Sequence, residues 1–356
     1  MRVYRSLVRP LLFRLDPERA HDLAVRAAEL ASRSRLVCRT LAARRVDPRL
    51  GVEVAGLRFA TPVGLAAGFD KSARAVPLLS SLGFGHVEIG SVSADPSAGN
   101  ARPRLFRLPD ERAIAVAYGV PNDGAERVAE RLAGPRPPVP LGVNVVSTNR
   151  GAASAVEPDE AVIGDYVDTV ARLQSYADYL CLNLSCPNTR DGRGFFADRA
   201  RLRALLDRLS ETGVRRPLFI KVAPFAEASE IDTLLEAVDG VPFVAGFSVN
   251  LPPGTRPDVR GAVSGPPARA AAERTVAELY ASGSHAVIGS GGIFTAEDAY
   301  RMIGLGASLV QIYTALVYEG PGVIRRIIER LAELAERDGL RSIGEAVGQA
   351  VPMRIV

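Results

Sequence analysis

The sequence predicts an α/β fold, a (β/α)8 TIM barrel with an N-terminal helical extension. Two observations carry this prediction: eight short apolar runs alternate with segments of helical spacing, and polar or small residues follow the end of nearly every run. Buried parallel strands read as continuous apolar runs, and eight such strands close a barrel. A doubly wound open sheet is the competitor, but residues 63–71 lack its early G-x-G-x-x-G pattern.

The expected barrel strands are regularly spaced and lie at residues 63–68, 86–92, 141–146, 179–185, 218–223, 244–250, 286–290 and 309–313. Helical spacing marks residues 72–82, 158–173, 199–212, 227–238 and 322–337. A short hairpin is expected over residues 51–62. A second hairpin, 104–108 with 113–118, is expected inside the long insertion at 93–138, beside the barrel mouth.

Residues 1–45 form the expected helical extension, and residues 46–356 form the barrel. The extension holds eleven arginines against four acidic residues, although the whole chain carries a net charge of only +4. Leucines among arginines indicate either contact with an anionic membrane surface or a solvated face packed on the body, and the pattern does not decide between them. No run reaches the roughly 20 apolar residues that span a bilayer. We expect a peripheral protein on the cytoplasmic face of the membrane, or a cytoplasmic one if these helices do not bind lipid.

Composition excludes several classes of site. Three cysteines in 356 residues make no disulfide framework, and three histidines without a CxxC or HExxH pattern argue against a metal site. The small net charge predicts no nucleic-acid partner.

A phosphate site is expected where the last two barrel strands end. Gly291 and Gly292 follow the seventh strand, Tyr313 and Thr314 follow the eighth, and Ser264-Gly265 lies in the preceding loop. Barrels commonly bind phosphate with these loops, because glycines let backbone N–H groups approach an anion closely. The competing interpretation is that the glycines only make tight turns.

Several long motifs also carry a resemblance to a known family. They are Pro17–His21 (PERAH), Gly64–Lys71 (GLAAGFDK), Glu88–Val92 (EIGSV), Arg102–Leu108 (RPRLFRL), Asn183–Asn188 (NLSCPN) and residues 307–313. In this order they resemble dihydroorotate dehydrogenases, in particular the membrane-associated, quinone-reducing class. The resemblance spans nearly the whole chain. It implies FMN in the barrel mouth, a small cyclic amide or carboxylate substrate, and a quinone tunnel roofed by the N-terminal helices.

The resemblance also implies roles for individual residues. Cofactor-binding residues would be Ala66, Ala67, Gly68, Lys71, Ser91, Asn144, Asn183, Lys221, Asn250, Ser264, Gly265, Gly291, Gly292, Tyr313 and Thr314. Asn183, Asn188 and Asn250 would bind substrate, and His21 and Arg107 would line the tunnel.

Cys186, Lys71 and Lys221 are the expected catalytic residues. A hydride would leave one ring carbon for the flavin while Cys186 removes a proton from the neighbouring carbon. A thiol with an ordinary pKa near about 8.5 suits this role better than a serine hydroxyl. Lys221 would stabilise negative charge on the reduced flavin. The competing interpretation of a cysteine, a small buried apolar side chain, fits Cys181 within its strand better.

The chain departs from the family pattern mainly on the substrate side. Cys186 stands where the quinone-reducing class has serine, Val116 where the family has a substrate-binding asparagine, and Ala117 where it has arginine. Further departures are Val120, Ser147 and Leu251. A site built to bond a polar ring discriminates strongly against the loss of such bonds. Three hypotheses stay open: a dihydroorotate:quinone oxidoreductase, a paralogue acting on a C–C bond of a different amide or acid in specialised metabolism, and a non-catalytic flavin-binding protein.

Overall fold

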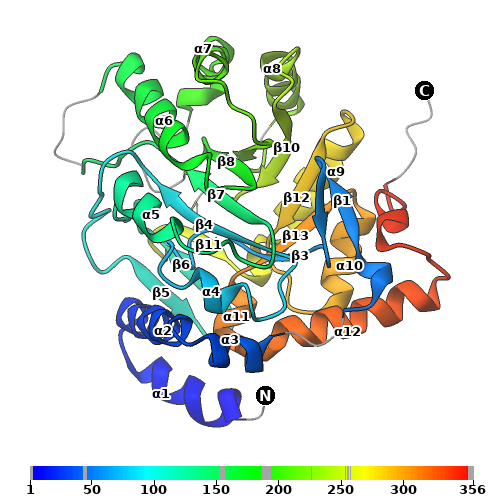
Figure 1. Cartoon of the computed structure of the whole chain (residues 1–356). Helices are drawn as coiled ribbons and strands as arrows, with labels where there is room; N and C mark the ends of the chain where they lie inside the picture. Colours follow the sequence, from blue (N-terminus) through cyan, green and yellow to red (C-terminus); the bar gives the residue numbers. More distant parts are fainter. Residues whose placement is uncertain are drawn as a thin grey trace.

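The computed structural model describes residues 3–42, 46–151, 157–186, 194–225, 227–252, 254, 256 and 258–351. A closed parallel barrel forms its centre, with strand order β10-β12-β13-β3-β4-β7-β8-β9 (Figure 1). All eight expected strands are confirmed. They are β3 (Val63–Leu65), β4 (His86–Val92), β7 (Leu141–Val145), β8 (Tyr179–Asn183), β9 (Leu218–Val222), β10 (Val244–Val249), β12 (Ala286–Ser290) and β13 (Leu309–Ile312).

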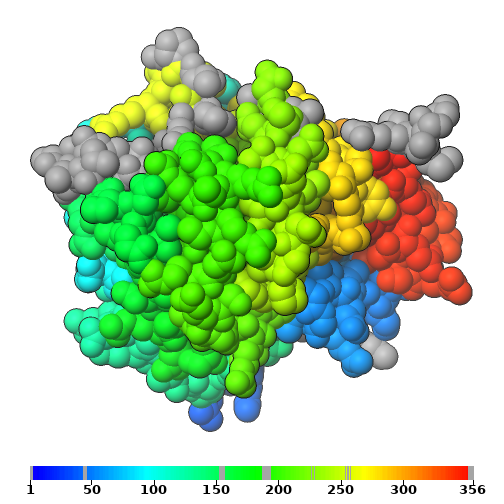
Figure 2. All heavy atoms as spheres, turned by 90° about the horizontal axis from the view of Figure 1, so that it is seen from above, coloured from blue at the N-terminus to red at the C-terminus, as the bar shows by residue number. Residues whose placement is uncertain are grey.

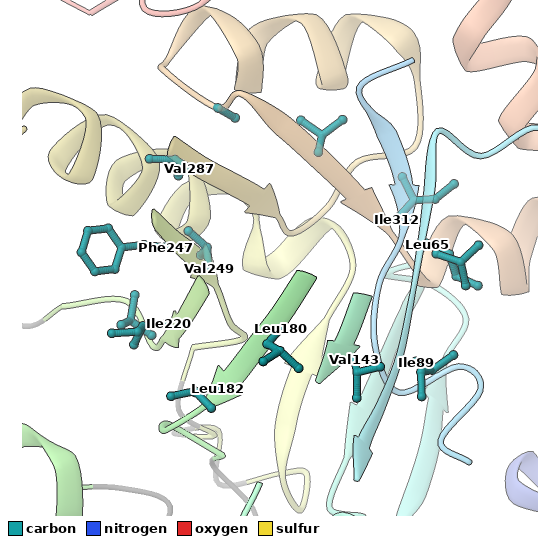
Figure 3. Close-up of a cluster of buried hydrophobic side chains, with 14 of the residues drawn as sticks. Leu65, Ile89, Val143, Leu180, Leu182, Ile220, Phe247, Val249, Val287 and Ile312 are labelled. Atoms are coloured by element: carbon teal, nitrogen blue, oxygen red, sulfur yellow. The ribbon is translucent and has the colours of Figure 1, made fainter. Parts of the chain in front are cut away.

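The barrel strands are buried on both faces, which explains their continuous apolar sequence. Side chains such as Leu65, Ile89, Val143 and Leu180 project from neighbouring strands into one hydrophobic cluster with the covering helices (Figure 3). Full burial of a side chain of this size stabilises the fold by about 1.5–3 kcal/mol. The polar groups described below therefore sit in a scaffold that holds them rigidly.

Helices cover the outside of the barrel (Figure 1). They are α4 (Val76–Leu79), α5 (Ala125–Leu132), α6 (Asp159–Leu173), α7 (Arg199–Glu211), α8 (Ala228–Val238), α9 (Arg269–Ala281), α10 (Ala296–Gly304), α11 (Thr314–Glu319) and α12 (Gly322–Arg337). From above, the helices of the middle of the chain, in green, cover much of the visible face (Figure 2).

The expected helix over residues 72–82 is wrong in extent, because only Val76–Leu79 is α-helical. The buried carboxylate of Asp70 accepts hydrogen bonds from the backbone N–H groups of Ser72, Arg74 and Ala75. Side-chain bonds of this kind compete with helical hydrogen bonding, and Ala73 accordingly has a φ of 57°. The segment after Lys71 therefore begins as a turn.

Both expected hairpins are present. β1 (Val52–Val54) pairs with β2 (Leu57–Phe59), and its side chains pack on the barrel interior beside Tyr179. β5 (Leu105–Leu108) pairs with β6 (Ala113–Val116). A third strand that the sequence reading did not anticipate, β11 (Ala262–Ser264), pairs with β6. This strand brings Ser264 beside the insertion, a placement that matters for the site.

The N-terminal extension is helical as expected. It forms the π-helical turn η1 (Tyr4–Val8), then α1 (Arg9–Arg14), α2 (Pro17–Ser32) and α3 (Arg35–Leu41), which lie beside α4, α11 and β5 (Figure 1). Hydrogen bonds from Arg104 to the buried carboxylate of Glu18 tie α2 to the insertion. Burial alone would raise the pKa of Glu18, but the bonds from Arg104 and Arg102 lower it below its ordinary value. Among the described residues no helix has the length and apolarity needed to cross a bilayer.

Candidate active site

A cavity of about 150 Å³ opens at the carboxyl end of the barrel strands. Most of the residues predicted to bind a cofactor line it together, although they come from six different segments of the chain. They are Ala66, Ala67, Gly68, Lys221, Asn250, Ser264, Gly265, Gly291, Gly292, Tyr313 and Thr314. In TIM barrels this end of the strands carries the active site.

The glycine turn after β12 fits an anion. Gly291 and Gly292 have φ values of 135° and 67°, and a Cβ on them would lie 2.6 Å from Ala272 Cβ and 2.8 Å from Arg269 Cβ. Close packing against α9 therefore requires glycine at both positions. Within the described part of the chain neither backbone N–H has a hydrogen-bond partner, so both remain available to phosphate oxygens. The two glycines can therefore form a tight turn and bind an anion at the same time.

Two hydroxyls lie beside this glycine turn, since a Cβ on Gly292 would lie 3.1 Å from the carbonyl oxygen of Gly265. Thr314 Oγ1 donates to Ser264 Oγ at 2.8 Å, and Ser264 Oγ donates to the carbonyl of Ile114 at 3.1 Å. The carbonyl belongs to β6, so the inserted hairpin fixes the position of the serine. Strand β11, which the sequence did not predict, thus places Ser264 at the predicted phosphate site.

An asparagine-rich chain of hydrogen bonds leads from Asn250 into the barrel. Asn250 Nδ2 donates to Asn183 Oδ1 at 3.2 Å, Asn183 Nδ2 donates to Ser91 Oγ at 3.0 Å, and Ser91 Oγ donates to Asn144 Oδ1 at 2.5 Å. Asn250 lines the cavity, whereas Ser91, Asn144 and Asn183 do not. The structure therefore brings the four predicted residues together as one network that reaches the cavity through Asn250.

Beneath Lys221 lies a buried carboxylate that the sequence reading missed. Glu88 is 0% exposed, and its Oε1 lies 3.8 Å from Lys221 Nζ. Asn144 Nδ2 donates to Oε1 at 2.9 Å; Tyr179 Oη and Gln311 Nε2 donate to Oε2 at 3.1 and 2.8 Å. The available signal was a lone glutamate inside an otherwise largely apolar run at 86–92.

The two cysteines near β8 differ in their surroundings. Cys181 lies within the strand beside Glu88, and burial followed by the Glu88 charge raises its pKa well above the ordinary value. Cys186 lies in the loop just past the strand and is 4% exposed. The predicted substrate residue Asn188 lies outside the described residues.

Lys71 lies apart from the cavity that it was expected to line. Its Nζ is 3.1 Å from His21 Nε2 and 4.2 Å from the centroid of the Tyr118 ring, in a polar pocket of about 210 Å³ against α2. Tyr118 lines both this pocket and the barrel-mouth cavity. Burial lowers the pKa of Lys71 to about 8.

A larger, mostly apolar cavity of about 940 Å³ lies under the N-terminal helices. Both predicted tunnel residues, His21 and Arg107, line it. Burial, followed by the nearby charge of Lys71, lowers the pKa of His21 well below its ordinary value, so the imidazole is neutral at pH 7. The Arg107 guanidinium donates to the carbonyls of Leu12, Phe13 and Leu15 and so holds the end of α1. Tyr313 lines both this cavity and the one at the barrel mouth.

A family model described as dihydroorotate dehydrogenase matches residues 49–335. The chain belongs to the dihydroorotate dehydrogenase family. A relative from Acidithiobacillus ferrooxidans named dihydroorotate dehydrogenase (quinone) is 41% identical over 96% of this chain and 98% of its own. One of the same name from Roseiflexus sp. is 42% identical over 97% and 98%. The crystal structure of DHODH from Eimeria tenella in complex with ferulenol superposes with a TM-score of 0.83 at 32% identity, covering 94% of this chain and 95% of that one.

The departures from the pattern of the dihydroorotate dehydrogenase family fall in two groups. Val116 and Leu251 line the barrel-mouth cavity and contribute apolar side chains to it. Val120 and Ser147 are not among its lining residues. Val120 has a φ of 52°, a region that β-branched residues rarely adopt. Asn250 and Lys221 still supply polar groups to the cavity.

Proposed function

We propose that the chain is an FMN-dependent dihydroorotate dehydrogenase that oxidises dihydroorotate to orotate and passes the electrons to a quinone. The observation that carries this proposal is the meeting of two cavities at Tyr313: one at the barrel mouth, where Lys221, Asn250 and the glycine turn supply polar groups, and a larger, mostly apolar one under the N-terminal helices. A polar reductant and an apolar oxidant thereby approach one region from separate sides. The family membership and the names of the relatives favour this function over both alternatives.

The residues at the barrel mouth fit FMN. The free N–H groups of Gly291 and Gly292, with the hydroxyls of Ser264 and Thr314, suit a terminal phosphate. Bound there, FMN supplies a two-electron acceptor for a hydride. Lys221 places a positive charge at the cavity wall, where it stabilises negative charge that develops during reduction.

Cys186 is the proposed base. It lies in the loop just past β8, next to Ser185, whose hydroxyl accepts a hydrogen bond from Asn250 Nδ2 at 3.2 Å. The thiolate takes the proton from the ring carbon adjacent to the one that loses the hydride. Val116 and Leu251 are apolar, so Asn250 is the asparagine of the cavity lining that remains to bond the substrate amide or carboxylate. Substrate-binding roles for Asn183 and Asn188 rest on the family resemblance.

The N-terminal helices are proposed to admit the quinone and to contact a membrane. Leu7, Leu11 and Leu30 are exposed on them, as an interfacial segment requires. Arg5 and Arg9 instead bond to the body, with Glu319 and with the carbonyl of Tyr318. The extension therefore combines the two interpretations of its sequence: some arginines pack on the body while leucines face outward.

Anaerobic reduction of the purified protein tests this function. The flavin absorbance at the visible maximum should bleach when dihydroorotate is added and return when a soluble quinone follows. Reduction by dithionite but not by dihydroorotate would reject the substrate. A preparation that holds no flavin after incubation with excess FMN would reject the cofactor.

A further inference from the structure

A charged group that the proposed chemistry does not use lies behind the residues that line the barrel-mouth cavity. Glu88 lies on β4, inside the barrel, with none of its surface exposed. A buried carboxylate is costly unless it is paired and hydrogen-bonded. Its position behind the cavity lining therefore needs an explanation beyond packing.

Each carboxylate oxygen of Glu88 interacts with side chains from other strands. Oε1 accepts from Asn144 Nδ2 of β7 at 2.9 Å and lies 3.8 Å from Lys221 Nζ of β9. Oε2 accepts from Tyr179 of β8 and Gln311 of β13, at 3.1 and 2.8 Å. Three of these donors are neutral, so the charge of the carboxylate is balanced by Lys221.

Lys221 depends on Glu88 in turn. No other carboxylate among the described residues lies within ion-pair distance of its Nζ. Lys221 and Gln311 line the cavity, whereas Glu88 and Tyr179 lie behind them. Glu88 therefore contacts residues that line the cavity but does not itself line the cavity.

We propose that Glu88 is a positioning residue that holds Lys221 at the cavity wall, offsets part of its positive charge, and thereby lowers the reduction potential of the bound FMN. This inference rests on the proposed FMN site. In a water-poor interior the field of one charge is weakly screened, so a carboxylate beside the ammonium reduces the attraction that a reduced, anionic flavin experiences. If Glu88 only accepted hydrogen bonds and its charge had no role, it would not affect the reduction potential of FMN.

The variant Glu88→Gln tests the inference, because it keeps the side-chain shape and removes the charge. The midpoint potential of bound FMN, titrated spectrophotometrically with reference dyes, should rise. We expect the preference for reduced over oxidised FMN to increase about tenfold, which corresponds to about 30 mV for a two-electron couple. The dissociation constant of oxidised FMN should change less than threefold.

Tyr179→Phe is the matched control, since it removes one hydrogen bond to Glu88 and leaves the charge in place. The preference of this variant for reduced over oxidised FMN should stay within twofold of that of the unmodified protein. A shift in Tyr179→Phe as large as that in Glu88→Gln would show that hydrogen bonding, and not charge, is responsible, and would overturn the inference. An unchanged potential in Glu88→Gln would also overturn it.

A double variant measures how much of the effect of Glu88 depends on Lys221. Because it removes both charges of the pair, it also leaves a test if Glu88→Gln alone does not fold. In a Lys221→Met background the Glu88→Gln change should shift the preference for reduced FMN by less than half of its effect in the unmodified protein, because the part that acts through the placement of Lys221 is gone and only the direct field of the carboxylate remains. A shift of undiminished size there would overturn the inference. If the unmodified protein bound no flavin, the proposed function would fail instead, so the two failures are distinguishable.

Discussion

Cys186 and Cys181 show how strongly position decides the chemistry of one residue type. Cys181 is inside β8, and burial raises its pKa well above the ordinary value, so it stays a neutral thiol. Cys186 lies beyond the strand end, where the chain reaches the mouth of the barrel. Cys186→Ala should slow flavin reduction by dihydroorotate by about 10²–10⁴-fold, the usual contribution of a general base. Stopped-flow absorbance measures that rate.

Cys38→Ala is the control, because Cys38 lies on α3 and does not line the barrel-mouth cavity. It should reduce at the rate of the unmodified protein. The FMN content of Cys186→Ala should also be normal. A tenfold or smaller loss of rate in that variant would assign the proton transfer to another group.

Lys71 yields a prediction for the pH dependence of stability. Burial lowers its pKa from 10.5 to about 8, so the folded chain loses this proton first. Below pH 8 both states hold the proton and the folded state bears the full cost of a buried ammonium. Between about pH 8 and 10.5 the unfolded chain binds more protons, so the free energy of unfolding rises with pH. The rise from this group is at most about 3 kcal/mol.

The variant Lys71→Met should abolish that rise. Its stability advantage over the unmodified protein should therefore shrink between pH 7 and pH 10, measured by denaturant unfolding. His21 does not titrate in this window, because its pKa is well below 6.5, and burial raises the pKa of Tyr118. A constant difference across the range would mean that Lys71 is solvated in the folded chain.

The same lysine marks a limit of sequence reasoning. The motif at 64–71 located Lys71 near the barrel mouth, but it could not say to which side of Tyr118 the side chain turns. That choice depends on His21, which arrives from α2 fifty residues earlier. Glu88 was missed for a related reason: its importance lies in partners on four other strands, which adjacency along the chain does not reveal.

At the scale of elements, the turn after β12 is the proposed phosphate site. Gly291→Ala would place a Cβ 2.6 Å from Ala272 Cβ at a φ of 135°. Because a backbone shift is then unavoidable, FMN affinity should fall at least about 100-fold, measured by quenching of free FMN fluorescence.

Gly164→Ala serves as the matched control within α6. A Cβ there meets nothing within 4 Å, so FMN affinity should be unchanged. Alanine should moreover stabilise the helix by up to about 1 kcal/mol. If Gly291→Ala bound FMN as tightly as Gly164→Ala does, the glycine turn would not be the phosphate site.

Elements were predictable where local pattern decides structure. The eight barrel strands and α12 follow from apolar periodicity, and α12 matches the expected residues 322–337. The extent of α4 was not predictable, because the Asp70 carboxylate captures the backbone of the preceding turn. Nor was β11, whose pairing partner β6 lies about 150 residues earlier in the chain.

At the scale of the whole molecule, the N-terminal helices cover an apolar cavity that shares Tyr313 with the cavity at the barrel mouth. α2 contributes Ala20, His21 and Ala24 to the apolar cavity, and the barrel contributes Tyr313. Substrate oxidation and quinone reduction should therefore be separable by mutation, which a single shared pocket would not allow.

Ala24→Phe tests that separation by filling the apolar cavity from α2 with an aromatic ring. Oxidation of dihydroorotate with a long-chain quinone should slow at least about tenfold, since the quinone loses its space, whereas a soluble dye that reaches the barrel mouth should still be reduced at the normal rate. Leu30→Phe is the control, because Leu30 is 62% exposed on the same helix and does not line the cavity. Equal loss with quinone and dye in Ala24→Phe would mean that the cavity supports the fold and does not admit the acceptor.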